Sequence, residues 1–165
     1  MKESNNQKKN KCKAEQVNLL DLSYEERTVI WSLRMSLSDQ KKRVRAEFNR
    51  AMPSAVARIA TGSVSGFIDG VRYHGKKSLL FNCMCKECLS EDEKRVVSLF
   101  QAITESDVSR IHRSAEVLVR DEGIEKIIDA ATGFLFALRI KDVGELCDVS
   151  GGLRQAEEMK STSIH

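Results

Sequence analysis

Apolar residues recur every three or four positions along most of this chain, which is the spacing of one face of an α-helix. Val44, Phe48 and Met52 show the pattern clearly, four residues apart. A single proline and an aromatic content of 5% disfavour a β-sandwich, which needs many turns and many aromatic or β-branched strand positions. We therefore predict an all-α fold.

Helix starts and ends can be read along the chain. Ser23 and Ser90 each precede a glutamate by three residues, the capping-box pattern in which side chain and backbone satisfy each other at a helix start. Pro53 would end a helix over 41–52, and a helix over 54–73 would follow. Gly123 suits the residue after the end of a helix that starts near Val108. With an apolar segment at 124–141, typical of the centre of a bundle, we expect about five main helices.

The length of 165 residues predicts one domain that buries its core without disulfides. We expect a flexible basic tail at 1–20, a helical domain at 21–143 and a loose tail at 144–165. The first ten residues are wholly polar, unlike a secretory signal, and no run of eighteen apolar residues suggests a membrane span. The sequence thus favours a cytosolic protein with reduced thiols and no membrane partner.

Charge is distributed unevenly. Residues 1–88 hold 17 Lys/Arg against 9 Asp/Glu, whereas residues 89–145 hold 8 against 12. This division can steer an anionic partner, favour head-to-tail self-association, or serve solubility alone. The helix over 41–52 carries five cations around all but its apolar side, as an ordinary solvated helix does. Nucleic-acid binding by this basic half is the alternative function. The cations are Lys41, Lys42, Arg43, Arg45 and Arg50.

Three glycines form a ridge of small residues on the helix over 54–73. Gly62, Gly66 and Gly70 are spaced by four, and each costs roughly 1 kcal/mol relative to alanine inside a helix. Such a ridge lets another backbone approach closely. The ridge therefore predicts close helix packing, either within the chain or with a protein partner or second copy.

The strongest chemical pattern is Cys83-Met84-Cys85-Lys86-Glu87-Cys88, three thiols in six residues. Because structural Zn²⁺ takes four ligands, commonly thiolates and imidazoles, we predict a zinc site at Cys83, Cys85 and Cys88 with His74 as the nearest fourth ligand. His112, Cys147 and Cys12 are other candidates for the fourth position. An iron–sulfur cluster is a lesser alternative because it usually needs four cysteines.

Two other interpretations of the thiols remain open. Leu79, Phe81, Cys83 and Cys85 occupy alternate positions, so all four could line a core face in a short extended segment. Alternatively, Cys85 and Cys88 have dithiol spacing before a helix start, which would suit a redox switch. The connection between the two helical halves is thus predicted to be irregular or briefly extended.

Catalytic motifs are missing from the sequence. It contains no G-x-x-x-x-G-K-[ST], no G-x-G-x-x-G and no G-x-S-x-G, so nucleotide-binding and hydrolase chemistry have no support. Paired acids such as Glu25 and Glu26 are explained by helix starts. The sequence gives no case for an enzyme and favours a small binding or regulatory protein.

The order of elements resembles that of small uncharacterised helical proteins of alphaproteobacteria. A glycine-containing helix with a basic end is followed by Cys83, Cys85 and Cys88 and then by a helix start at 90–93. In that group the cysteines are more tightly clustered. The resemblance covers roughly residues 25–140, and it implies a helical fold and no established activity.

Overall fold

The protein is an all-α bundle, which confirms the predicted fold class. The computed structural model describes residues 16–158, with side chains up to Ile140, and contains six α-helices there rather than five. Their bounds are α1 Tyr24–Leu37, α2 Lys41–Ala51, α3 Ser54–His74, α4 Glu91–Thr104, α5 Val108–Leu118 and α6 Asp121–Glu158, preceded by a 3-10 turn, η1 Leu19–Asp21.

Both predicted capping boxes form. The Glu26 amide donates to Ser23 Oγ at 3.2 Å while the Ser23 amide donates to Glu26 Oε2 at 2.8 Å. At the second box the Glu93 amide donates to Ser90 Oγ at 3.1 Å and the Ser90 amide to Glu93 Oε2 at 2.7 Å. Each pair satisfies two backbone donors that a helix start would otherwise leave unpaired.

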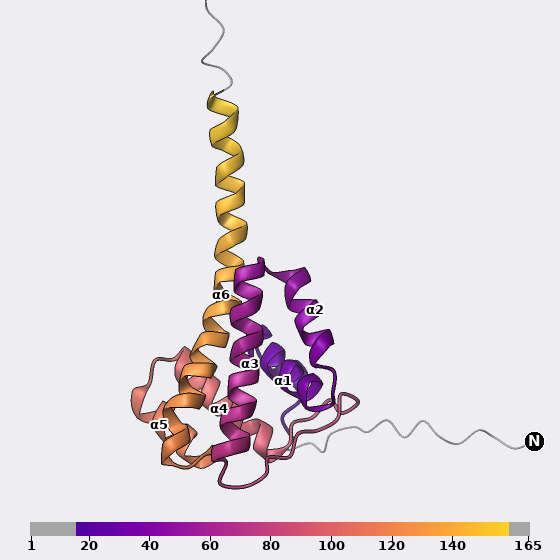
Figure 1. Ribbon diagram of the computed structural model, residues 1–165, viewed down its shortest axis with the longest axis vertical. Helices are drawn as coiled ribbons and strands as arrows, with labels where there is room; N and C mark the ends of the chain where they lie inside the picture. Colours follow the sequence, from indigo (N-terminus) through magenta and orange to yellow (C-terminus); the bar gives the residue numbers. More distant parts are fainter. Residues whose placement is uncertain (1–15, 159–165) are drawn as a thin grey trace, which may run out of the picture.

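Helices α3 and α6 lie side by side through the body of the molecule, and α6 continues beyond it (Figure 1). Helices α4 and α5 form a hairpin, and α1 and α2 cover the other side of α3. Four phenylalanines from four helices meet in the core, with ring centroids 5.7–6.4 Å apart. They are Phe48, Phe67, Phe100 and Phe134.

The glycine ridge of α3 packs within the chain. A Cβ on Gly70 would lie 2.7 Å from Ile127 Cγ2 of α6, so the close approach requires glycine there. At Gly66 a Cβ would make ordinary contact with Ala130, and at Gly62 it would meet open space within 4 Å. The ridge therefore serves α3–α6 packing at two of its three positions.

The predicted role of Gly123 as a helix end is wrong. Helix α5 ends at Leu118, and Gly123 lies in the first turn of α6. A Cβ on Gly123 would lie 2.4 Å from the Cβ of His74, so glycine is needed for close packing against the end of α3.

The structure near both ends of the described chain can be compared with the predicted domain boundaries. The Leu19 amide donates to the Glu87 carbonyl at 2.7 Å, and the Leu89 amide to the Val17 carbonyl at 3.0 Å. The start of the described chain thus pairs with the backbone around Cys88. Helix α6 passes the predicted domain end at residue 143, while residues 1–15 and 159–165 of the predicted tails lie outside the described residues.

Among the described residues, no helix combines the length and apolar character that crossing a membrane would require.

Candidate functional site

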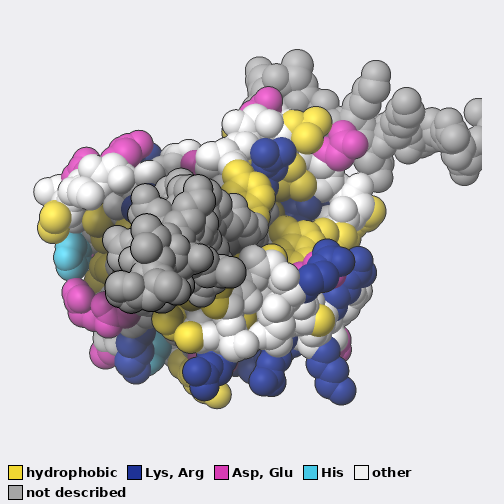
Figure 2. Space-filling model, turned by 90° about the horizontal axis from the view of Figure 1, so that it is seen from above, with side chains coloured by type: hydrophobic (Ala, Val, Ile, Leu, Met, Phe, Trp, Pro, Cys, Tyr) yellow, Lys and Arg dark blue, Asp and Glu magenta, His cyan; other side chains and the backbone are white. Residues whose placement is uncertain are grey.

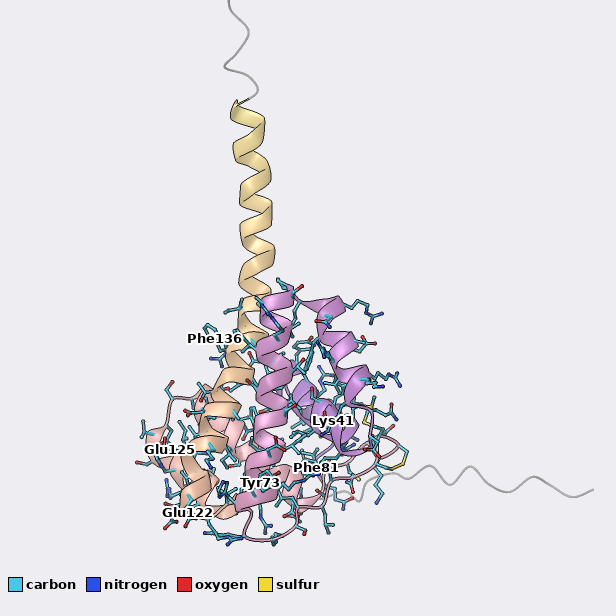
Figure 3. The ribbon with its side chains drawn as sticks, in the orientation of Figure 1. Lys41, Tyr73, Phe81, Glu122, Glu125 and Phe136 are labelled. Carbon is cyan, nitrogen blue, oxygen red and sulfur yellow. A yellow bond between two sulfur atoms is a disulfide. The ribbon has the colours of Figure 1, made fainter. Side chains whose placement is uncertain are left out.

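The thiol loop, residues 83–88, lies in the irregular connection between α3 and α4. A turn closed by the Lys86 amide and the Cys83 carbonyl at 3.1 Å brings the Cα atoms of Cys83 and Cys85 within 5.3 Å. These two cysteines form a disulfide, visible at the outer edge of the connection in Figure 3. Cys88 is half-buried and has a free thiol.

Several expectations about the thiols are corrected by this arrangement. Reduced thiols were expected, but one disulfide is present, and it joins Cys83 to Cys85 rather than Cys85 to Cys88. The core-facing interpretation is also wrong for Cys83 and Cys85, because both are exposed. The reason is the turn, which carries the chain away from the core just after Phe81, whereas an extended segment would have kept it on the core face.

A buried arginine on α1 holds the backbone of the thiol loop in place. No sequence pattern described above indicated it. Arg34, near the end of α1, is 3% exposed. Its guanidinium donates to Glu93 Oε1 at 2.6 Å and Oε2 at 2.9 Å, forming a two-bond ion pair. It also donates to three loop carbonyls, those of Cys83 at 3.3 Å, Lys86 at 2.7 Å and Cys88 at 3.0 Å. All five donors of the guanidinium are therefore used.

Glu93 joins the loop to the start of α4. Besides binding Arg34, its carboxylate accepts the Ser90 amide and, at 3.1 Å, the Asn82 amide. The Asn82 side chain in turn donates to the Cys88 carbonyl at 2.8 Å. A carboxylate that is 0% exposed is retained in the interior because each oxygen has a charged partner and a backbone partner.

Asp92 anchors the other half of the connection. It accepts the Leu80 amide at 2.9 Å and pairs with Lys77 at 2.8 Å and Arg95 at 2.6 Å. Burial acts to raise the pKa of Asp92, but the hydrogen bonds from Lys77 and the Leu80 amide and the charge of Lys77 outweigh it. The pKa of this carboxyl therefore lies below its ordinary value.

The predicted metal ligands are not gathered. In the part of the chain that the structure describes, no group of three or more His, Cys, Asp or Glu residues is placed to hold a metal ion. The His74 imidazole lies 2.9 Å from the amino group of Lys126 on α6, whereas the thiol loop is bound by Arg34 of α1. His112 lies exposed on α5, and Cys12 and Cys147 fall among residues whose side chains are not described. The zinc site stays a prediction.

An apolar pocket of about 440 Å³ opens beside the anchored connection. Its walls come from the end of α1, one face of α3 and residues 75–81. Figure 3 shows Phe81 on the connection and, at the end of α3 on the same side of the molecule, Tyr73. The apolar lining residues are Leu33, Leu37, Phe67, Ile68, Val71, Leu79 and Phe81.

Helix α2 presents its cations to solvent as predicted. Lys41, Lys42, Arg43, Arg45 and Arg50 are all exposed, while Val44 and Phe48 are buried. In the view down α6, lysine and arginine side chains gather along one side of the molecule (Figure 2). Arg50 pairs with Glu47 at 2.6 Å, and nucleic-acid binding by this face stays a prediction.

The fold and the anchored loop define a small helical bundle with a pocket and a thiol loop at one end. Comparison of the chain with protein-family models, with curated proteins and with solved structures found no match.

Proposed function

We propose that this protein is a small-molecule binding protein whose ligand is an amphipathic anion, with an apolar body and one negatively charged group. The observation that supports it is the apolar pocket between α1, α3 and residues 75–81. Its volume of about 440 Å³ is in the range of pockets that hold small ligands, and such pockets are mostly apolar with a few polar groups that fix orientation.

The apolar part of the ligand has a continuous wall to contact. Phe67 and Ile68 are buried at the back of the pocket, and Leu37, 48% exposed, lies at its edge. Each square ångström of apolar surface removed from water contributes about 25 cal/mol. When an apolar ligand chain covers Leu37 and the half-buried Leu79, apolar surface of both the ligand and the protein is removed from water, and both contribute to the binding free energy.

The charge preference comes from the rim. Arg72 and Lys77 line the pocket, and no acidic side chain among the described residues does. Lys77 is paired with Asp92, whereas Arg72 is exposed and has no partner in the described part of the chain. An anionic group at the mouth would give Arg72 a charge-assisted hydrogen bond.

The wall formed by residues 75–81 is held in place before any ligand binds. The backbone of Leu80 is fixed on both sides, its amide by Asp92 and its carbonyl by the Ser90 hydroxyl at 2.6 Å. The Arg34–Glu93 pair holds the next stretch through Asn82. A pre-formed wall loses little conformational entropy on binding, which favours a binding role for this end of the bundle.

Calorimetric titration with decanoate, a carboxylate with an apolar chain, tests the proposal. We expect saturable binding with one site per chain, and weaker binding of the uncharged decanol. Arg72→Glu should weaken decanoate binding by about tenfold or more, because one charge-assisted contact becomes a repulsion. Leu37→Asp should weaken both ligands, because it places a charge on the apolar wall.

Arg58→Glu is the matched control. Arg58 is exposed on the same helix, about 21 Å from Arg72 by helical rise and on a nearby face. If Arg58→Glu weakens decanoate as much as Arg72→Glu, general charge explains the result and the anion site is wrong. If neither decanoate nor decanol binds, the pocket is not a ligand site.

A further inference from the structure

We propose a second, independent ligand site on the α4–α5 hairpin that binds the phosphate group of a small phosphate monoester. The hollow there has a volume of about 410 Å³ and is lined by three arginines, two serines and one valine. These residues are Arg95, Arg110, Arg113, Ser98, Ser114 and Val117. This site does not depend on the pocket beside residues 75–81.

The hairpin brings the arginines together from two helices. Arg95 and Ser98 are three residues apart on α4, and Arg110, Arg113 and Ser114 lie on the facing side of α5. Residues three or four apart share one face of a helix, so both helices direct their cations toward the same seam. No acidic side chain among the described residues lines the hollow, although this half of the sequence is acidic overall.

The guanidinium groups are held from outside the hollow. Arg95 is fixed by Asp92 at 2.6 Å, and Arg110 contacts Glu105 and, at 3.3 Å, Gln101. Arg113 makes only a hydrogen bond to the Ser109 carbonyl at 3.3 Å and has no acidic partner in the described part of the chain. One cation is thus uncompensated, and the acid beside Arg95 is already shared with Lys77.

The two serine hydroxyls supply the second, independent observation. Ser98 and Ser114 both line the hollow and are half-buried. Neither side chain has a hydrogen-bond partner in the part of the chain that the structure describes. Hydroxyl donors together with planar guanidinium donors are the groups that recognise phosphate oxygens.

Val117 indicates a monoester rather than free phosphate. It is 52% exposed and lines the hollow, so it can contact the carbon part of a ligand whose phosphate lies among the arginines. Phenyl phosphate should therefore bind more tightly than inorganic phosphate, and Val117→Ser should remove that difference.

Nuclear magnetic resonance titration of the full chain with inorganic phosphate and with phenyl phosphate, against sodium chloride of equal ionic strength, tests the site. We expect saturable shifts of the Ser98 and Ser114 amides with both phosphates and none with chloride. Arg113→Ala should raise the dissociation constant about tenfold, because one charge-assisted contact is lost. Ser98→Ala with Ser114→Ala should raise it as well.

Arg43→Ala, an exposed arginine of α2, is the control with the same change in net charge. Unsaturable shifts, or equal weakening by Arg43→Ala and Arg113→Ala, would show general ionic screening and overturn the site. Equal affinity for both phosphates in the wild type would overturn the monoester assignment. Decanoate binding should be unchanged by Arg113→Ala, which separates this site from the pocket beside residues 75–81.

Discussion

Replacing Arg34 by methionine should destabilise the protein severely. The substitution keeps an apolar stem of similar length but leaves the Glu93 carboxylate, whose side chain is 0% exposed, without its cation. Removing one partner of a buried ion pair costs about 3–5 kcal/mol. Since a whole domain is stable by only about 5–15 kcal/mol, a large part of the total free energy of unfolding would be lost.

The loss is expected to exceed that of a surface pair for a structural reason. Arg34 also holds the carbonyls of Cys83, Lys86 and Cys88, so the variant removes the inner support of the thiol loop. Urea unfolding followed by circular dichroism gives the change in free energy. Trypsin cleavage after Lys86 should become faster in the folded variant, because the loop opens more often.

Glu93→Gln completes a double-mutant cycle. Glutamine can still form a capping box with Ser90, but it removes the buried negative charge. We expect the combined variant, Arg34→Met with Glu93→Gln, to lose roughly 1–2 kcal/mol less stability than the sum of the losses of the two single variants, which is the coupling expected of residues in contact. A loss below about 1 kcal/mol for Arg34→Met, or strictly additive effects, would refute the reasoning. Arg43→Met on the exposed face of α2 serves as the control.

Three further predictions concern single features. Gly70→Ala should destabilise the protein because the new methyl group would meet α6 at 2.7 Å, whereas Gly62→Ala, which meets open space, should stabilise it by up to about 1 kcal/mol; equal effects in urea unfolding would contradict the assigned packing. Asp92 has a pKa below its ordinary value of 3.8, so its stabilising effect is present above that pH and is lost as the pH falls through the folded-state pKa. The difference in melting temperature between wild type and Asp92→Asn should therefore narrow in acid, and a constant difference would argue against the ion pairs. Mass spectrometry without reductant should show alkylation of Cys88 alone among residues 83–88, and alkylation of all three would mean that the disulfide is not formed.

The sequence was informative wherever a local pattern determines local structure. The capping boxes at Ser23 and Ser90 and the stop at Pro53 depend on residues within four positions of each other, and all three were located correctly. Gly123 was misassigned because the same residue suits a helix end and a close contact. The contact that shows which role applies is made by His74, which is distant in the sequence.

The organisation of the candidate site could not be predicted in the same way. Arg34 and Glu93 are 59 residues apart, and an arginine near a helix end is normally a solvated residue. The one available signal was its place between Leu33 and Met35 in the apolar run of α1, and Glu93 was already explained by its capping role. The three clustered arginines of the α4–α5 hollow could not be found from the sequence for a related reason. The net charge of residues 89–145 adds these arginines to acidic residues on other faces, so the total does not show the cluster.

The pairing of the first described residues with the thiol loop has a mechanical consequence. Two backbone hydrogen bonds between residues 17–19 and 87–89 would bear tension that reaches the start of the described part of the chain. A pulling force applied there would load Leu89 and Glu87 directly, on either side of Cys88, before it reached α1. Force on the amino-terminal end would therefore be transmitted to the thiol loop. Single-molecule extension from this terminus should break these two hydrogen bonds and change the accessibility of Cys88 while the bundle stays folded.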